Sequence, residues 1–187
     1  MVLLEKPIET KDLILRSLRP GDAHGPYAAW MHDPVVTRYL EARSAPPDQA
    51  ELEVYIAAMN DSRDNLLVGM FPLTAPGRHI GNAKIGPIDR RHQTAALGIA
   101  IGAKEHWGKG LATQALAALA RHAFTALGLE RLEAGFYAGN VASLRAFRSI
   151  GFVEEGRRRG ARCCEGLRVD EIIMGLLRDR PDTKDKR

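Results

Sequence analysis

The chain has 187 residues, of which 45% are hydrophobic and 27% charged, and its formal net charge is +4. This composition is ordinary for a globular domain, and no run of eighteen apolar residues indicates a membrane span. The first residues include a glutamate and no long apolar segment, so we expect no signal peptide. Cys163 and Cys164 are adjacent, so we expect free thiols and a cytoplasmic protein. Six histidines and two cysteines show no metal-ligand spacing.

The first half of the chain combines short apolar runs with two helical patterns. A strand at 13–18 is followed by the turn Arg19-Pro-Gly-Asp22 and a helix at 23–32, which Asp33-Pro34 ends. Residues 35–43 form a connector of undetermined form. A second helix begins at Pro46-Pro47-Asp48 and ends at Asn60. Strands at 66–73 and 79–88 are most simply an antiparallel pair.

The second half centres on a buried strand at 95–102, a glycine-bearing turn and a long helix. Apolar residues at spacings of three and four give that helix one apolar face: Ala112, Leu116, Leu119, Ala123 and Leu127. Gly128 is a candidate C-cap. A strand at 131–137, a helix from Asn140 to about Ile150 and two more strands, starting at Gly151 and spanning 166–177, complete the pattern. We expect one domain over residues 1–178 and a loose charged tail over 179–187.

The turn between the central strand and the long helix reads Trp107-Gly-Lys-Gly-Leu-Ala112. A helix N-terminus presents unpaired backbone N–H groups and a positive dipole end, and glycines let a ligand approach closely. These features favour binding of a phosphate group. The turn lacks the Gly-Lys-Ser/Thr of a P-loop and the third glycine of a dinucleotide fingerprint.

Several motifs together resemble the GCN5-related N-acetyltransferase (GNAT) superfamily. The turn is similar to its acyl-CoA loop, Gln/Arg-x-x-Gly-x-Gly/Ala, and Asn140-Val-Ala-Ser143 with Gly151-Phe152 is similar to a later motif. Residues 13–16, 33–39 and 151–157, with Asp170-Glu171, resemble the RimJ/RimL-type branch in particular. The resemblance extends over about residues 8–177.

The resemblance implies an α/β (α+β) fold with a mixed six- to seven-stranded sheet, about four helices and a central strand pair that splays apart. It also implies acetyl-CoA as co-substrate, a primary amine as acceptor and no metal. Its pattern assigns the acetyl-CoA contacts to the following residues: Ile99, Ala100, Ile101, Trp107, Gly108, Lys109, Gly110, Leu111, Ala112, Thr113, Asn140 and Ser143. Asn140 also suits the N-cap of its helix.

Two positions depart from the superfamily's catalytic pattern. Ala96 occupies the position of a general-base glutamate found in many relatives, and Phe147 that of a general-acid tyrosine. Direct attack of an amine on a thioester needs a neutral amine, a stabilised oxyanion and a proton for the departing thiolate. We therefore consider His92 and Glu105 as candidate bases, Ser143 as the proton donor, and a backbone N–H near Ile99 as the oxyanion donor.

The acceptor stays open between a protein α-amine and a small amine such as an amino sugar. An α-amine is neutral more often at pH 7 than a lysine side chain, so it depends less on a base at position 96. Lys84 and Tyr137 are candidates for the acceptor side. The alternative is a non-catalytic acyl-CoA-binding or regulatory protein of the same fold. A homodimer is compatible with the sequence.

The arginines at 157–159, with Arg162 and Arg168, form the densest basic patch. Its simplest interpretation is a solvated strand end; binding of an acidic partner is a second one. No aromatic residues are interleaved with these arginines, so we expect neither direct nucleic-acid binding nor membrane binding.

Overall fold

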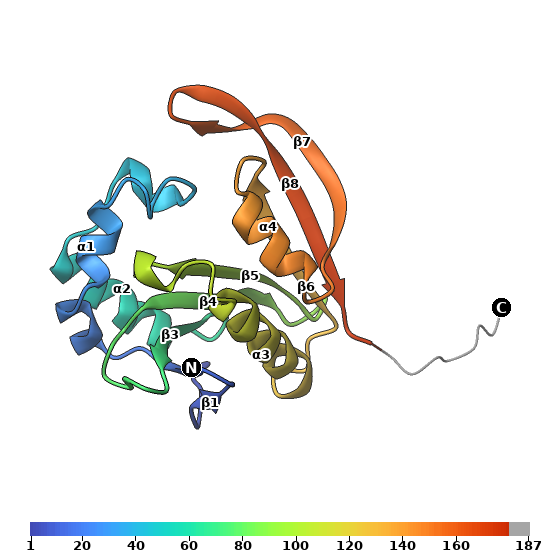
Figure 1. Cartoon of the computed structure of the whole chain (residues 1–187). Helices are drawn as coiled ribbons and strands as arrows, with labels where there is room; N and C mark the ends of the chain where they lie inside the picture. Colours follow the sequence, from blue (N-terminus) through green and yellow to red (C-terminus); the bar gives the residue numbers. More distant parts are fainter. Residues whose placement is uncertain (180–187) are drawn as a thin grey trace, which may run out of the picture.

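The computed structural model describes residues 1–179, in which four α-helices pack around an eight-stranded sheet (Figure 1). The strands are β1 (Ile8–Glu9), β2 (Leu13–Ser17), β3 (Leu66–Pro72), β4 (Gly81–Asp89), β5 (Thr94–Ile101), β6 (Arg131–Tyr137), β7 (Val153–Cys164) and β8 (Leu167–Leu177). The α-helices are α1 (Tyr27–His32), α2 (Gln49–Asp61), α3 (Leu111–Thr125) and α4 (Val141–Arg148). Three short 3-10 helices are η1 (Pro20–His24), η2 (Glu41–Ser44) and η3 (Lys104–His106). Beyond Asp179, the predicted tail lies outside the described residues.

The strand order across the sheet is β1-β2-β3-β4-β5-β6-β8-β7. Neighbouring strands are antiparallel except β5 and β6, which are parallel and joined by the α3 crossover. This confirms the predicted mixed sheet, including the antiparallel pair β3 and β4. Seven strands fall where the sequence predicts them. The eighth is the two-residue β1, which pairs with β2 through Ile8 and Leu15 and is too short to leave a pattern.

The helix predicted at 23–32 is two separate pieces, η1 and α1. Gly25 between them has extended backbone angles, φ −86° and ψ −151°, and Pro26 is the N-cap of α1. Proline has no N–H for the helical hydrogen-bond pattern and disfavours helical geometry in the residue before it. Gly25-Pro26 therefore breaks the helix that the apolar pattern alone predicts.

Helices α1 and α2 cover one face of the sheet, while α3 and α4 lie side by side against the other (Figure 1). Asp48 caps α2: its side chain accepts a hydrogen bond from the Glu51 backbone N–H at 2.8 Å. The predicted apolar face of α3 packs into the core, where Leu116, Leu119 and Ala123 are completely buried. The C-cap of α3 is Ala126 and not the predicted Gly128, which has φ +67° and lies three residues after the end of the helix.

Strands β7 and β8 form a long hairpin that projects beyond the rest of the sheet toward the segment between α1 and α2 (Figure 1). Several hydrogen bonds hold that segment in place. Tyr39 donates its hydroxyl hydrogen to Gly139 O at 3.0 Å, and Arg38 pairs with Glu165 at 3.0 Å. The connector that the sequence leaves without a form is therefore fixed by contacts with distant parts of the chain.

Candidate functional site

The parallel strands β5 and β6 separate after three residue pairs. Thr94, Ala95 and Ala96 are paired with Arg131, Leu132 and Glu133, and no later residue of β5 is paired with β6. Strand β5 continues to Ile101 along β4, whereas β6 continues to Tyr137 along β8. The two strands thus open a gap at the carboxyl end of β5, as predicted for a splayed central pair.

The alternation of backbone hydrogen bonds identifies which residues of β5 face this gap. Arg131 N donates to Gln93 O on the β6 side, and Gly102 N donates to Ile80 O on the β4 side. Odd-numbered residues of β5 therefore direct their N–H and C=O groups toward the gap. Ile99 and Ile101 face it as expected, but the backbone of Ala100 faces β4. The Ile101 carbonyl already accepts the Trp107 indole N–H at 2.7 Å.

The turn that follows β5 has an open concave backbone. Gly108 and Gly110 have φ of +71° and +73°, left-handed values that favour glycine, and a Cβ on either would meet no atom within 4 Å. Gly110 is the N-cap of α3 and supplies no side chain to it. The N–H groups of the first helical residues, Leu111 to Thr113, have no carbonyl four residues earlier within the helix. The turn therefore suits a phosphate anion.

The N-terminus of α4 follows the end of β6, on the α3 side of the sheet. Asn140 is its N-cap, because its side-chain oxygen accepts the Ser143 backbone N–H at 3.3 Å. Thr113 on α3 and Ser149 on α4 share a hydroxyl–hydroxyl hydrogen bond of 3.3 Å. This contact couples the helix that begins at the turn to the helix that carries Ser143.

The two positions that lack the superfamily's ionisable groups have structural roles here. Ala96 is the last residue of β5 paired with β6 and marks the start of the gap. Phe147 is 1% exposed and meets Phe136 and Phe152 edge to face, with ring centroids 4.8 and 5.0 Å apart. These aromatic contacts anchor α4 on β6.

The structure does not bring the two candidate bases to the gap. His92 lies on the exposed turn before β5, at the paired end of the strand, with its Nδ1 2.9 Å from Asp89 Oδ2. Glu105 lies in η3 and forms an ion pair with Arg78. His92 is therefore separated along β5 from Ile99.

A cavity of about 510 Å³, here called the β4–β5 cavity, opens on the α1/α2 face of the sheet. Gly98, Ile99 and Ala100 form part of its wall, so it adjoins the residues that face the gap. Most of the remaining lining is apolar: Met31, Leu40, Ala42, Pro47, Leu52, Leu67 and Ala83. Its charged lining residues are Lys84 from β4 and Glu41 from η2.

Glu41 forms hydrogen bonds with residues of β6 and β7. Its Oε1 accepts hydrogen bonds from the Tyr137 hydroxyl at 3.1 Å and from Arg162 at 2.6 Å. Arg162 in turn pairs with Glu171, which is 3% exposed and also bonds Arg158 at 2.7 Å. No sequence pattern points to Glu41. Of the two residues predicted for the acceptor side, Lys84 lines this cavity and Tyr137 donates a hydrogen bond to Glu41.

Two tyrosines give the β4–β5 cavity its hydroxyl groups. Burial raises the pKa of Tyr27 well above its usual range, and it raises the pKa of Tyr55 as well. Both hydroxyls therefore stay protonated near neutral pH. They line the cavity as neutral groups that can donate a hydrogen bond.

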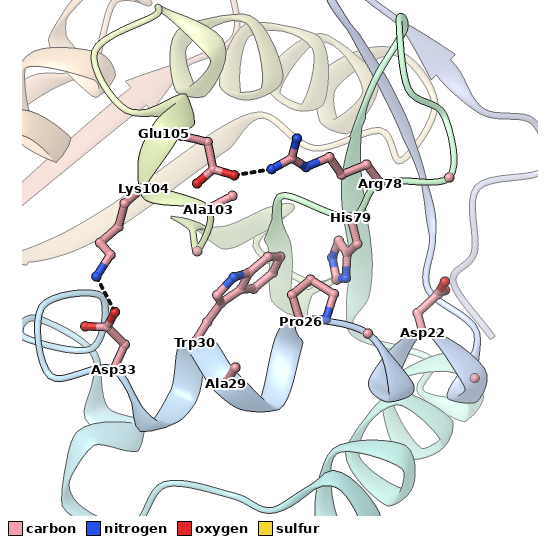
Figure 2. A pocket seen from close by; sticks show the side chains of 14 residues that line it. Asp22, Pro26, Ala29, Trp30, Asp33, Arg78, His79, Ala103, Lys104 and Glu105 are labelled. Carbon is pink, nitrogen blue, oxygen red and sulfur yellow. Dashed lines mark hydrogen bonds and ion pairs between the residues drawn. The ribbon is translucent and has the colours of Figure 1, made fainter.

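A second cavity, of about 610 Å³ and here called the η3 cavity, lies between η1, α1, the β3–β4 loop and η3 (Figure 2). Four of its charged side chains pair with one another, Lys104 with Asp33 at 2.5 Å and Arg78 with Glu105, and Asp22 pairs with Arg16 outside the cavity at 2.7 Å. His79 in its wall is 5% exposed, and burial lowers its pKa, so the ring is neutral at pH 7. Its Nε2 lies 2.7 Å from Asn82 Oδ1, so Nε2 carries the hydrogen.

Among residues 1–179 no group of three or more metal-ligating side chains lies together, and none of the described helices is long and apolar enough to cross a membrane. Cys163 and Cys164 are free thiols. Most arginines of the basic patch bond within the chain, Arg157 to Asp170 and Arg168 to Gly160 O for example, in agreement with a structural role.

Residues 12–153 match the family model of the acetyltransferase (GNAT) domain. The chain belongs to the GNAT acetyltransferase family. The N-acetyltransferase p20 of Bacillus licheniformis is 29% identical to it over 90% of this chain and 94% of the relative. The resemblance drawn from the sequence motifs is thereby confirmed.

Solved structures of other GNAT proteins share the fold. A spermidine N-acetyltransferase from Vibrio cholerae, in complex with CoA and spermine, has a TM-score of 0.80 at 24% identity, covering 90% of this chain and 96% of that one. RimL, a ribosomal L7/L12 α-N-protein acetyltransferase in complex with coenzyme A, has a TM-score of 0.82 at 17% identity, covering 92% and 98%. These two enzymes act on different amines, so the shared fold does not select an acceptor.

Proposed function

We propose that this GNAT protein is a cytoplasmic N-acetyltransferase that transfers the acetyl group of acetyl-CoA to a primary amine, and that residues 1–178 form one domain. The gap between β5 and β6 carries the proposal. It exposes the Ile99 backbone beside the β4–β5 cavity, and the glycine-bearing turn follows the end of the same strand. CoA in the solved structures of two relatives supports acetyl-CoA as the donor.

The chain offers a set of contacts that fits each part of acetyl-CoA. The N–H groups of Gly108, Lys109 and Gly110, with those of Leu111 to Thr113, bind the pyrophosphate, because the turn is open and the helix dipole is positive there. Ile99 and Ile101 bind the amides of pantetheine as a neighbouring strand would. Trp107 keeps the turn against β5 through its bond to Ile101 O.

We assign roles in the reaction to three residues, Ile99, Ser143 and Asn140. The Ile99 N–H faces the gap and stabilises the developing oxyanion of the thioester carbonyl. Ser143, at the N-terminus of α4, donates a proton to the departing thiolate. Asn140 orients this end of the helix through its bond to the Ser143 backbone. The amine approaches from the β4–β5 cavity, forms the new C–N bond and displaces sulfur.

Calorimetric titration of acetyl-CoA, followed by a screen of amines for CoA release, tests the proposal. We expect a Kd in the micromolar range and CoA release with at least one amine. Absence of binding to the folded protein would refute the proposal. Binding without turnover on any amine would favour a non-catalytic acyl-CoA-binding protein, the alternative suggested by Ala96 and Phe147.

A further inference from the structure

The β4–β5 cavity carries two opposite charges that do not neutralise each other. Lys84 extends from β4 and Glu41 from η2, and both line the cavity. Among the ion pairs of residues 1–179, none joins them, although the η3 cavity pairs its own charges directly. A ligand with one group of each charge would complement the two side chains simultaneously.

Lys84 is the cation that lacks a partner. Its side chain is half-buried against an apolar wall, and in the described part of the chain it takes part in no hydrogen bond or ion pair. Partial removal of an ammonium from water is unfavourable unless an acceptor replaces the lost water. An anionic group of a ligand would be a suitable partner at this position.

Glu41 lies at the cavity mouth with its side chain 73% exposed, and one of its two oxygens is available to a ligand. Tyr137 and Arg162 both donate to its Oε1, while Oε2 has no partner in the described part of the chain. Buried Glu171 holds Arg162, so the position of Glu41 depends on a group from the core of the hairpin. A carboxylate held in this way can accept hydrogen bonds from an ammonium at the cavity mouth.

The space around the two charges is shaped for an apolar group. The neighbouring lining comes from Met31, Leu40 and Leu52, with the aromatic rings of Tyr27 and Tyr55. The lining does not favour a polycation, because Glu41 is its one carboxylate and Lys84 repels a second cation. The cavity therefore combines one cation site, one anion site and an apolar wall.

We propose that the acceptor is a zwitterionic α-amino acid with an apolar side chain. Lys84 binds its carboxylate and Glu41 its ammonium. This inference rests on the proposed function and specifies its substrate class. In this proposal Glu41 is the proton acceptor. Ala96 cannot accept a proton, and His92 lies far from the gap.

The transfer balances as follows. Glu41 accepts one proton from the ammonium, and the neutral nitrogen attacks the thioester carbon. The C–N bond forms and the C–S bond breaks. The thiolate takes a proton from the Ser143 hydroxyl, and the second proton that leaves the nitrogen passes to Ser143 and restores its hydroxyl. The products are the N-acetyl amino acid, CoA and one proton that Glu41 releases to solvent.

The first test compares L-leucine, L-leucinamide and spermidine in a CoA-release assay, each over a concentration series up to about 10 mM, roughly tenfold above the usual upper range of KM, so that the initial slope gives kcat/KM. L-leucinamide retains the amine and side chain but lacks the carboxylate, as a protein N-terminus does. We expect kcat/KM for L-leucine to exceed that for L-leucinamide about 10- to 100-fold. Equal or better use of L-leucinamide or spermidine would overturn the inference.

Substitutions locate the effect. Lys84→Met should lower kcat/KM for L-leucine about 10- to 100-fold and leave L-leucinamide nearly unchanged. Its control is Lys11→Met, an exposed lysine outside both cavities. Glu41→Gln should lower kcat and remove the fall of kcat at acidic pH that protonation of a catalytic base causes. Glu9→Gln, an exposed residue of β1, should change neither. An unchanged leucine-to-leucinamide ratio in Lys84→Met would contradict the assignment.

A measurement of acetyl-CoA binding distinguishes failure of the proposed function from failure of the substrate assignment. If acetyl-CoA does not bind, the proposed function fails together with the inference. If acetyl-CoA binds and spermidine or L-leucinamide is the better acceptor, the proposed function stands and the inference is wrong. If acetyl-CoA binds and L-leucine gives no CoA release, the inference is also wrong.

Discussion

The β4–β5 cavity and the η3 cavity are similar in size, about 510 and 610 Å³, but differ in how their charges are arranged. In the η3 cavity, Lys104 neutralises Asp33 and Arg78 neutralises Glu105 (Figure 2). In the β4–β5 cavity, Lys84 has no partner among residues 1–179, and Glu41 is held by Tyr137 and Arg162. The β4–β5 cavity is the better candidate for a reaction site because of its unpaired charge and the exposed β5 backbone beside it, and not because of its volume.

The two cavities also differ in their relation to the gap. Ile99 belongs to the wall of the β4–β5 cavity, and its N–H faces the gap between β5 and β6. The η3 cavity is formed by residues beyond the end of β5, such as Ala103 and Glu105. A thioester in the gap would therefore be adjacent to the β4–β5 cavity.

The largest effect is expected at the turn that would deliver acetyl-CoA to this cavity. Gly110→Asp places a carboxylate beside the pyrophosphate, and we expect at least about a 100-fold loss of acetyl-CoA affinity by calorimetry. Gly110→Asn is the matched control, since asparagine tolerates the φ of +73° without the charge. Equal loss in both variants would show that backbone geometry, and not charge, causes the effect.

The next effect concerns stability and contrasts the ion pairs near the two cavities. Glu171→Ala leaves Arg158 and Arg162 without their buried partner, and we expect a loss of about 2 kcal/mol, less than for fully buried pairs because both arginines contact solvent. The melting temperature should fall by roughly 4–8 °C. Glu105→Ala removes an exposed pair and should leave the melting temperature unchanged. The reverse order would contradict the comparison.

A smaller effect is expected from pH, because His79 is buried in the wall of the η3 cavity. Burial lowers its pKa in the folded protein, so the unfolded chain binds more protons below about pH 6.5. Stability should therefore decrease as the pH falls from 7 to 5, by at most about 1.4 kcal/mol per pH unit from this group. Burial lowers the pKa of His122 too, so its contribution adds to this slope.

Urea unfolding at several pH values measures that slope. His79→Gln keeps an amide donor for Asn82 and should flatten the dependence, as should His122→Gln. His32→Gln changes an exposed histidine and serves as the control. An unaltered slope in both His79→Gln and His122→Gln would exclude these groups as the cause.

The smallest effect is expected for a charge in the η3 cavity. Lys104→Met removes the partner of Asp33 but touches neither the gap nor the β4–β5 cavity. We expect kcat/KM for the best acceptor to stay within about twofold of the wild-type value. A loss comparable to that of Lys84→Met would indicate that the η3 cavity takes part in the reaction.

Local sequence patterns predict most of the fold correctly, because they reflect local physics. The apolar face of α3, the glycine turn before it and the strands at 66–73 and 131–137 depend on neighbouring residues only. The break between η1 and α1 was missed because the apolar spacing continues across Gly25-Pro26. The two-residue β1 was missed because it is shorter than any periodic pattern.

The residues of the candidate site also fall into those that short sequence motifs predict and those that only the fold brings together. The turn, Asn140 and Ser143 belong to short motifs, whereas Glu41 begins the short 3-10 helix η2 and meets Tyr137 and Arg162 at separations of 96 and 121 residues. Such contacts leave no local pattern. The prediction of His92 as a base rested on its position before the central strand, and the structure places it at the opposite end of that strand from the gap.

Hydrogen exchange with and without acetyl-CoA tests most directly whether the gap and the turn bind this molecule. Amides that gain a hydrogen bond exchange more slowly. The account predicts that acetyl-CoA slows exchange at Ile99 and Ile101 in the gap and at residues 108–113 of the turn. Protection confined to residues around the η3 cavity, such as 77–79 and 102–105, or no protection at all, would contradict it.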